Sequence, residues 1–443
     1  WGEAAPGEAV TVTLGEAVAK VSADAAGAWR VTLPPRGEAT GLTLTVSGEN
    51  TLTVTNVAVG DVWFCSGQSN MEMTLGGCNA PKDVAAADFP LIRFLRVPKA
   101  VSPGRCDAPP AGMGGWRVCS PAMAAGVTAV GFYFAREIQP QAGVPIGIID
   151  TSWGGSRIEP YIAPEGIAAV PEAAALTAPF AEAVAAYRGA LGSGLDAVAQ
   201  WVDATRAALA AGQPLPAHPP LPADPAADPQ QWHAKFNAMI APFTTYPVRG
   251  FLWYQGCANG REGTSYVHKT RALVAGWRAL WGDEALPFYA VQLANFTADK
   301  RNPEGGDGYA PVRLAQMEAS RALPYSGLAV AIDIGETSDI HPKNKFDVGV
   351  RLARWALRNE YGKEGLVASG PLYKGMTVKD GAVRIAFDSV GGGLMAGTKK
   401  GREPVVRNPD GRLERFAIAG EDRKWYWADA VIEGDVVVVS SQQ

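Results

Sequence analysis

Cysteine and histidine are scarce in this sequence. Its 443 residues include five cysteines and four histidines, with no C-x-x-C pair and no nearby pair of histidines. A structural zinc site draws several such ligands from short spacings, so the sequence predicts no metal centre. The odd number of cysteines leaves at least one thiol free. The others fit either one or two disulfides or buried single thiols.

Clustered basic charge and long apolar segments are also missing. The formal net charge is −4, which disfavours nucleic acid and anionic membranes as partners because both attract clustered lysine and arginine. No apolar stretch approaches the roughly 20 residues of a membrane-spanning helix. The chain opens at Trp1 with neither methionine nor signal peptide, and it ends in a strand-like run. We therefore expect a mature or trimmed fragment.

Three hydropathy patterns follow one another along the chain. Residues 8–60 alternate polar and apolar positions between turn residues, which is typical of short antiparallel strands. From Asp61 onward, runs that are apolar throughout alternate with helical patterns, which indicates a parallel sheet covered on both faces. The alternating pattern then returns. We expect an α/β domain over 61–365 between β-sandwich-like lobes at 1–60 and 366–443.

An alanine-rich stretch and a proline-rich stretch interrupt the central region at about 165–230. Apolar residues recur at helical spacing from Phe180 to Leu191 and again from Leu195, after a Gly-Ser-Gly sequence. This pattern predicts a helical hairpin with one apolar stripe, which we expect to pack on its own domain. The proline-rich residues 213–229 predict an extended loop.

Polar residues suited to acyl transfer follow four of the expected central strands. They are S-G-Q-S-N at 66–70, T-S-W-G-G-S-R at 151–157, C-A-N-G at 257–260 and E-T-S-D-I-H-P at 336–342. The carboxyl ends of parallel strands meet at one sheet edge, where ligands bind. A serine, a glycine pair, amide side chains and a histidine are therefore expected to gather there.

Ser69 and His341 are the candidate nucleophile and general base. A serine hydroxyl becomes a good nucleophile only when a neighbouring base takes its proton. Ser69 stands where a helix is expected to begin, and the positive end of a helix favours negative charge. Pro342 disfavours helical geometry for His341, which places the imidazole on a loop. The alternative for Ser69 alone is a simple helix cap; the joint placement of the four loops favours the nucleophile.

Donors for an oxyanion are available in the same loops. The tetrahedral intermediate of acyl transfer needs N–H groups aimed at its oxygen. The backbone N–H of Ser69 and that of Gly154 or Gly155 suit this role, since glycine lets the backbone approach closely. The side-chain amide of Gln255 or Asn259 can add a donor.

Four motifs together resemble the sialate O-acetylesterase family of SGNH-type carbohydrate esterases. They are DVWFCSGQSNMEM, GVPIGIIDTSWGGSRIEPYI, VRGFLWYQGCANG and DIGETSDIHPKNKFDVGVRLARWAL, and the similarity extends over nearly the whole chain. The resemblance implies an SGNH-hydrolase-like parallel sheet flanked by helices. It also implies a serine esterase that removes O-acetyl groups from sugars without a metal or cofactor. Many members are exported, which implies an extracellular or periplasmic protein.

The resemblance also implies residue roles. Ser69 would be the nucleophile and His341 the general base. The oxyanion would be held by the Ser69 amide, the Gly155 region and Gln255. Gln68 and Asn70 flank the nucleophile. They either hold its geometry, which we expect, or hydrogen-bond only their own turn.

The third member of the triad stays open. The SGNH arrangement has an aspartate three residues before the histidine, but Ser338 occupies that position. Asp339 is our first choice, and Glu336 and Asp333 are alternatives. A carbonyl or a water can also orient the imidazole, because the acid mainly fixes the tautomer and stabilises the imidazolium. Cys257 stands where many relatives carry a glutamate.

The substrate is expected to be an acetylated sugar or glycan. Arg157 follows the glycine pair and either binds a sugar carboxylate or hydroxyl through its planar fork or is a structural surface charge. Trp153, on a loop, is expected to touch the sugar. Sialic acid esters, acetylated plant polysaccharide such as xylan or xyloglucan, and carbohydrate binding on an inactive esterase fold are the three readings of the function. The sequence does not fix an oligomeric state.

Overall fold

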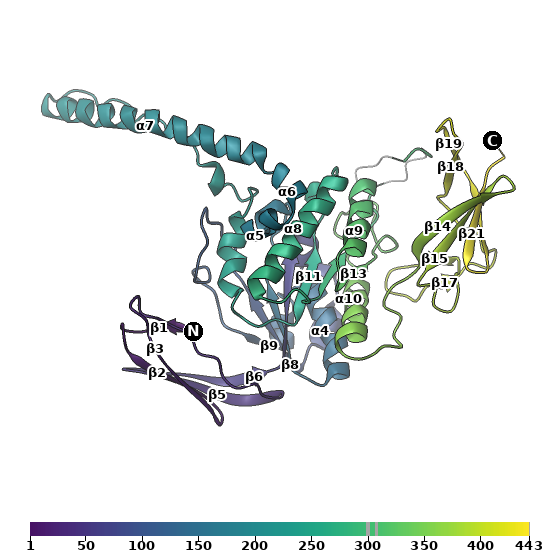
Figure 1. Cartoon of the computed structure of the whole chain (residues 1–443), viewed down its shortest axis with the longest axis horizontal. Helices are drawn as coiled ribbons and strands as arrows, with labels where there is room; N and C mark the ends of the chain where they lie inside the picture. Colours follow the sequence, from purple (N-terminus) through teal and green to yellow (C-terminus); the bar gives the residue numbers. More distant parts are fainter. Residues whose placement is uncertain (298–301, 306–308, 443) are drawn as a thin grey trace.

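A seven-stranded sheet forms the centre of the molecule (Figure 1). The computed structural model describes residues 1–297, 302–305 and 309–442. Six strands of the sheet are parallel and the edge strand β9 is antiparallel. In spatial order they are β13 Ser326–Ala329, β12 Phe288–Val291, β11 Gly250–Tyr254, β7 Asp61–Gly67, β10 Ile146–Asp150, β8 Phe89–Arg96 and β9 Arg117–Cys119. The expected α/β sheet is confirmed.

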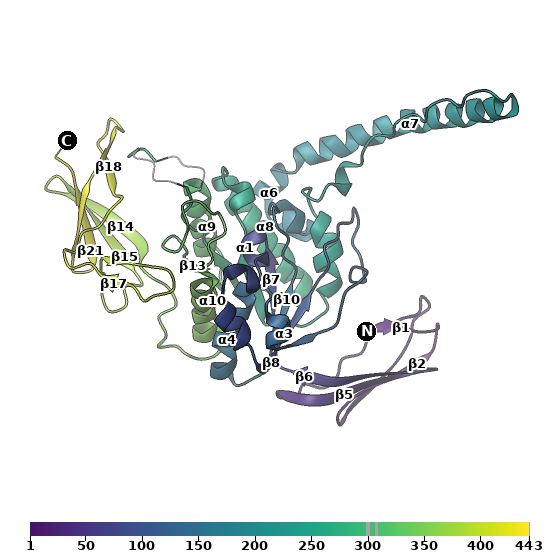
Figure 2. The ribbon, with the colours of Figure 1, turned by 180° about the vertical axis from the view of Figure 1, so that it is seen from behind.

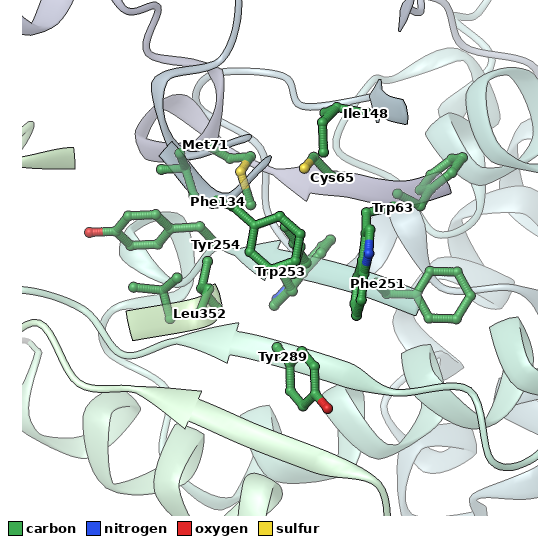
Figure 3. Close-up of a cluster of buried hydrophobic side chains, with 14 of the residues drawn as sticks. Trp63, Cys65, Met71, Phe134, Ile148, Phe251, Trp253, Tyr254, Tyr289 and Leu352 are labelled. Carbon is green, nitrogen blue, oxygen red and sulfur yellow. The ribbon is translucent and has the colours of Figure 1, made fainter. Parts of the chain in front are cut away.

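Helices cover both faces of this sheet. Successive residues of a strand point to opposite faces, and on β7 Trp63 packs edge-on against Phe134 of α4 with ring centroids 5.0 Å apart. Its neighbour Phe64 instead packs against Trp277 of α8 at 5.9 Å. The longer helices are α4 Ala129–Ala142, α8 Thr264–Trp281, α9 Ala310–Ala322 and α10 Lys345–Glu360. Figure 3 shows the apolar core between β7, β11 and α4.

Shorter helical segments connect these elements. They are α1 Ser69–Glu72, η1 Gly76–Cys78, α2 Pro81–Ala85, α3 Pro121–Ala124, η2 Glu159–Tyr161, α5 Pro164–Ala169, α6 Pro171–Ala175, η3 Pro225–Ala227, η4 Phe236–Ile240, η5 Ala241–Phe243 and η6 Cys257–Asn259. All five cysteines carry free thiols, so the alternative of single thiols describes this structure. In the part of the chain that the structure describes, no helix is long and apolar enough to cross a bilayer.

Antiparallel strands form both ends of the chain, on either side of the central body (Figure 2). Each end has one four-stranded sheet, in the orders β3-β2-β5-β6 and β14-β15-β21-β20, with short two-stranded ribbons beside it. The sandwich-like form of these lobes and the boundaries at 60 and 365 stay predictions. The strands are β1 Gly2–Glu3, β2 Ala9–Leu14, β3 Ala17–Ser22, β4 Ala28–Trp29, β5 Ala39–Ser47, β6 Thr51–Val59, β14 Leu372–Lys379, β15 Ala382–Asp388, β16 Gly397–Thr398, β17 Val406–Arg407, β18 Ala417–Ala419, β19 Trp425–Trp427, β20 Asp429–Glu433 and β21 Val436–Ser440.

The expected helical hairpin is wrong. One 33-residue helix, α7 Ala178–Ala210, runs straight through the Gly-Ser-Gly sequence and projects from the body (Figures 1 and 2). A glycine inside a helix costs only about 1 kcal/mol relative to alanine, and the surrounding alanines are the best helix formers. None of the α7 residues is buried. Phe180, at the start of the apolar stripe, packs against the central core. Further along the helix the contact is with the returning proline-rich segment, as in the hydrogen bond from Trp201 Nε1 to the Pro216 carbonyl at 2.8 Å.

A loop of the C-terminal segment reaches back to the central body. Lys399 pairs with Asp347 in the first turn of α10 at 2.7 Å, and both side chains are largely buried. Three residues on, Arg402 pairs with Asp83 of α2 at 2.6 Å. The loop between β16 and β17 therefore forms ion pairs with α2 and with the start of α10.

Candidate active site

The turn after β7 presents Ser69 at the carboxyl edge of the sheet. Gly67 has φ +134°, and a Cβ built there would lie 2.3 Å from the carbonyl oxygen of Tyr254 on β11. Only glycine fits this approach. The N–H of Gln68 then donates to the same carbonyl at 3.0 Å. The turn is thus fixed to the neighbouring strand, and α1 begins at Ser69.

Gln68 links the nucleophile turn to the loop after β11. Its side chain is 3% exposed. The side-chain Oε1 accepts the backbone N–H of Gly256 at 3.0 Å and that of Ala258 at 3.3 Å. The side chain therefore bonds beyond its own turn and joins two of the four loops.

Ser69 and His341 meet across the sheet edge. The hydroxyl oxygen of Ser69 lies 2.8 Å from Nε2 of His341. The other ring nitrogen, Nδ1, lies 3.3 Å from Oδ1 of Asp339. This is the order nucleophile, base and orienting acid that serine catalysis requires.

Asp339 is held as an anion beside the imidazole. Its Oδ1 accepts the backbone N–H of His341 at 2.8 Å, and its Oδ2 pairs with Lys343 Nζ at 3.0 Å. The backbone hydrogen bond from His341, followed by the one from Lys343, lowers the pKa of Asp339 to about 2. An ionised carboxylate at this point favours a proton on Nδ1 and leaves Nε2 free to accept the Ser69 proton.

The two alternative acids have other partners. Asp333 makes two hydrogen bonds with the Arg351 guanidinium, at 2.6 and 2.7 Å. Glu336 accepts the backbone N–H of Lys343 at 2.6 Å. Neither contacts the imidazole among the interactions of the described residues, so of the three carboxylates Asp339 is the one placed to orient it.

Asn70 connects the nucleophile to the loop of the base. It is 2% exposed. Its Nδ2 donates to the carbonyl of Ile340 at 3.0 Å, and its Oδ1 accepts from Lys345 Nζ at 2.6 Å. Both partners flank His341 in the sequence. Asn70 is therefore a tie between two segments that lie 270 residues apart.

The loop after β10, residues 151–157, carries the glycine pair and is called the glycine loop; it lies against Ser69. A Cβ built on Gly154 would stand 3.5 Å from the Ser69 Cβ. The N–H of Gly154 is taken by a hydrogen bond to the Glu72 carboxylate. Within the described residues, the N–H groups of Ser69 and of the exposed Gly155, which has φ +74°, have no protein acceptor. These two amides are the donors available for an oxyanion.

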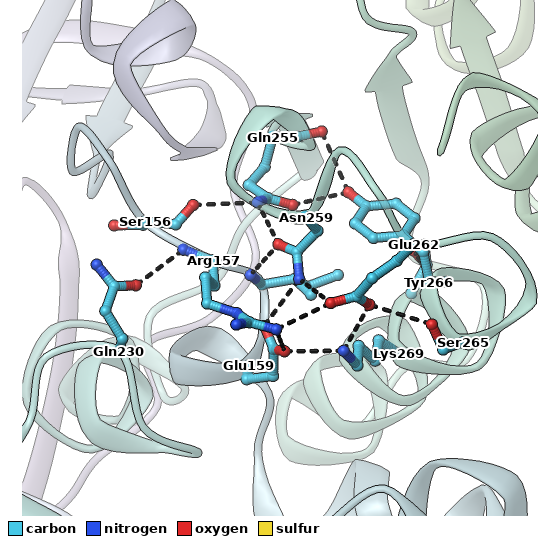
Figure 4. Close-up of polar contacts among 12 residues, drawn as sticks. Ser156, Arg157, Glu159, Gln230, Gln255, Asn259, Glu262, Ser265, Tyr266 and Lys269 are labelled. Carbon is cyan, nitrogen blue, oxygen red and sulfur yellow. Dashed lines mark hydrogen bonds and ion pairs between the residues drawn. The ribbon is translucent and has the colours of Figure 1, made fainter. Parts of the chain in front are cut away.

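The expected role of Gln255 as an oxyanion donor is not supported. Its side chain is fully buried, and its Nε2 donates to the Ser156 carbonyl at 3.0 Å and to Asn259 Oδ1 at 2.8 Å. Both amide hydrogens are thus used, and Oε1 accepts the Tyr266 hydroxyl at 2.8 Å (Figure 4). Because the side chain points into the body from the end of β11, it braces the loop. Asn259 is likewise occupied, since its Nδ2 donates to two carboxylates.

Arg157 belongs to a charge-balanced cluster (Figure 4). Its guanidinium lies 2.8 Å from Glu159 and 2.9 Å from Glu262, and Lys269 bridges the same two carboxylates. Burial alone raises the pKa of Glu159, but Lys269 and Arg157 together hold it below its usual value. The side chain of Arg157 stays 44% exposed. The charges of two cations and two anions therefore balance one another beside the glycine loop.

Trp153 is half-buried between two cations. Lys235 Nζ lies 4.6 Å from its ring centroid, and Lys99 Nζ lies 5.8 Å from it. Lys235 is 1% exposed, and burial lowers its pKa to about 8. The indole is thus held in place at the rim of the loop, with part of its surface open to solvent.

Sequence reasoning missed two residues that hold the glycine loop. Gln230 accepts the N–H of Arg157 at 3.0 Å and donates to the carbonyl of Gly155 at 3.2 Å. Glu72 accepts the N–H of Gly154. Gln230 directly follows the proline-rich residues 213–229, and no local pattern indicates that this segment returns to the site. Glu72 is a first-turn acid of α1, which by itself predicts only a helix start.

Comparison with known proteins extends this description. No family model matches the chain. It is 28% identical over 409 residues to the sialate O-acetylesterase of Homo sapiens, covering 84% of this chain and 69% of that protein. The rat enzyme of the same name is 28% identical over 417 residues, covering 84% and 72%. The crystal structure of a novel carbohydrate acetylesterase from Xanthomonas citri matches with a TM-score of 0.79 and 34% identity, covering all of this chain and 86% of that one.

These relatives define the class of the protein as a carboxylic ester hydrolase. Identity at this level extends over nearly the whole length, and the shared fold includes the sheet that carries Ser69 and His341. The chain belongs to the family of the carbohydrate acetylesterase, with which it is 34% identical, and it is similar to the sialate O-acetylesterases.

Proposed function

We propose that this chain is a serine esterase of the SGNH type that removes O-acetyl groups from sugars. The observation that carries the proposal is the contact of 2.8 Å between Ser69 Oγ and His341 Nε2, with Asp339 behind the ring. The names of the relatives support the sugar: one is a carbohydrate acetylesterase, and others are sialate O-acetylesterases.

Acylation would begin with attack of Ser69 Oγ on the acetyl carbonyl carbon. The hydroxyl proton passes to His341 Nε2, and the carbonyl oxygen becomes an anion that the N–H groups of Ser69 and Gly155 receive. Asp339 stabilises the imidazolium that forms. When the C–O bond to the sugar breaks, the sugar oxygen takes the proton from Nε2 and leaves as a hydroxyl.

Deacylation would reverse the same roles with water. His341 Nε2 takes a proton from water, whose oxygen attacks the acetyl-enzyme carbonyl. The same two N–H groups hold the second oxyanion. Ser69 regains its proton from His341 as acetate leaves. The acetyl ester and one water are the two reactants that these steps consume, and the sugar and acetate are the two products.

A neutral acetylated sugar suits this edge better than an acidic one. Recognition of a sialate carboxylate needs a cation with an unsatisfied charge. Among the described residues, the exposed cations near Ser69 already pair with carboxylates: Arg157 with Glu159 and Glu262, Lys99 with Glu72, and Lys343 with Asp339. This observation favours acetylated plant polysaccharide, our alternative substrate class, over sialic acid esters.

Acetate release from 4-nitrophenyl acetate tests the serine mechanism. We expect turnover by the wild type and at least about a 10³-fold loss in Ser69→Ala. Absence of turnover in the wild type, or equal turnover in the variant, would refute the proposal and favour the non-catalytic alternative. Acetylated sialic acid, xylan and xyloglucan, assayed side by side, then separate the two substrate classes.

A further inference from the structure

Lys345 is a buried lysine that pairs with no carboxylate among the described residues. The residue is the first of α10, and its exposed fraction is 0%. No ion pair to an acid involves its Nζ in the part of the chain that the structure describes. Burying an ammonium group is costly unless hydrogen bonds compensate. An interaction other than an ion pair must therefore stabilise the buried ammonium group of Lys345.

The Lys345 ammonium bonds to both sides of the catalytic pair. Its Nζ donates to the Asn70 Oδ1 at 2.6 Å, and Asn70 directly follows the nucleophile. It also donates to the carbonyl of Pro342 at 2.7 Å, and Pro342 directly follows the base. One atom thus joins the segment of Ser69 to the segment of His341.

Asn70 completes this link on the other side of the histidine. Its Nδ2 donates to the carbonyl of Ile340 at 3.0 Å. The peptides before and after His341 are therefore both held, one by Asn70 and the other by Lys345. Since Asn70 and Lys345 also bond to each other, the two side chains form one unit that fixes the base loop relative to the nucleophile turn.

We propose that Lys345 is a positioning residue for the esterase reaction, acting with Asn70 to hold His341 Nε2 within reach of Ser69 Oγ. This inference rests on the proposed function, because it assigns a role relative to the Ser69–His341 pair. Among the interactions of the described residues, Lys345 contacts neither Ser69 Oγ nor His341 Nε2. A displacement of about 1 Å between reacting groups can cost about 10²-fold in rate, which sets the size of the expected effect.

The surroundings of Lys345 support a role in geometry. Its Nζ lies 5.6 Å from the ring centroid of Tyr254, which is also fully buried. The charged or titratable groups nearest in effect are Cys78, Cys257, Lys343 and Glu336. Burial is the main cause that lowers its pKa. Two short hydrogen bonds, to Asn70 Oδ1 and to the Pro342 carbonyl, are the direct polar contacts of this buried ammonium group among the described residues.

Steady-state kinetics of Lys345→Met and Asn70→Ala with 4-nitrophenyl acetate test this role. We expect each variant to lose about 10- to 100-fold in kcat with KM changed by less than about threefold. In the double variant the loss should be close to that of one single variant, because the two side chains act as one unit. Additive losses would overturn the inference.

A stability-matched control separates position from folding. Leu352, on the same helix, is fully buried and distant in sequence from the loop. We expect Leu352→Ala to lose stability but to keep the kcat of its folded fraction within about threefold of the wild type. If Lys345→Met loses activity only in proportion to its unfolded fraction, as Leu352→Ala would, the role is structural and the inference fails.

The outcome stays decisive if Lys345→Met does not fold. Asn70→Ala then carries the test alone, and a kcat within about threefold of the wild type would overturn the inference. Ser69→Ala distinguishes a failure of the proposed esterase function from a failure of the positioning role of Lys345 and Asn70. If Ser69→Ala keeps activity, the proposed function itself fails; if it is inactive while Asn70→Ala is fully active, only the positioning role fails.

Discussion

Asp339 binds His341 through both the backbone and the ring. Its Oδ1 accepts the backbone N–H of His341 at 2.8 Å and lies 3.3 Å from Nδ1 of the same residue. An aspartate two residues before the histidine reaches the ring in this way because the chain turns tightly between them. The departure from the usual spacing of three therefore leaves the acid in place.

Asp339→Asn is expected to lower kcat by about 10²-fold, because an amide no longer favours the productive tautomer of His341. The loss should fall below that of a fully buried acid, since the Asp339 side chain is 34% exposed and shared with Lys343. Initial rates with an aryl acetate measure it. Glu336→Gln is the matched control and should stay within about threefold of the wild type. A larger loss in Glu336→Gln than in Asp339→Asn would reverse the assignment.

Gln255→Leu should weaken folding more than catalysis. The change removes the hydrogen bonds of the Gln255 side chain to the Ser156 carbonyl, Asn259 Oδ1 and the Tyr266 hydroxyl, which we expect to cost about 1–3 kcal/mol in the free energy of unfolding. Loss of a true oxyanion donor costs about 10²–10³-fold in kcat, whereas here the folded enzyme should lose less than about tenfold. Urea denaturation and kcat on the same preparation decide. A fall in kcat of three orders of magnitude with unchanged stability would restore the oxyanion role.

Stability above neutral pH should depend on Lys345. Burial lowers its pKa from 10.5 to about 8. Between about pH 8 and 10.5 the unfolded chain binds the proton that the folded chain has lost, so the free energy of unfolding rises with pH through this interval. Lys345→Met lacks this contribution. The Lys345 charge offsets part of the rise that burial causes in the pKa values of Cys78 and Cys257, so these thiols add to the difference between the two proteins. When both proteins are denatured at pH values from 7 to 10.5, the free energy of unfolding of the wild type should rise relative to that of the variant. Parallel plots of this free energy against pH would contradict the lowered pKa of Lys345.

Gly192→Ala distinguishes a continuous α7 from a hairpin. In the continuous helix the substitution meets no atom within 4 Å and should stabilise the helix by about 0.5–1 kcal/mol. At a hairpin turn the same change would destabilise. Amide hydrogen exchange over residues 185–200 measures the local effect. Gly189→Ala, also inside α7 and equally free of neighbours, is expected to increase protection in the same way.

The sheet and the catalytic pair were predictable because their patterns are local or follow from topology. Apolar strands such as β11, whose five residues are all buried, read clearly as a covered parallel sheet. The rule that ligands gather at the carboxyl edge then brought Ser69 and His341 together from positions 272 residues apart. The motif resemblance pointed to the same two side chains.

Side-chain direction and long-range contacts were beyond the sequence. The Gln255 amide points into the body because it hydrogen-bonds with Tyr266 and Asn259 there. No sequence pattern at the end of a strand predicts this direction. Gln230 and Lys345 hold the site through contacts between remote segments. The Gly-Ser-Gly sequence in α7 favoured a turn by composition, but the alanine-rich flanks and the returning proline-rich segment kept the helix continuous.

The ion pairs of Lys399 with the start of α10 and of Arg402 with α2 limit which C-terminal segments can be exchanged between related proteins. Asp347, which Lys399 holds, lies six residues after the base, so the C-terminal segment helps to fix the helix that follows His341. An exchange of that segment for another module would preserve every catalytic side chain and still release this helix. Transplants that retain residues 399–402 with their reach to Asp83 and Asp347 should therefore be the ones that yield active chimaeras.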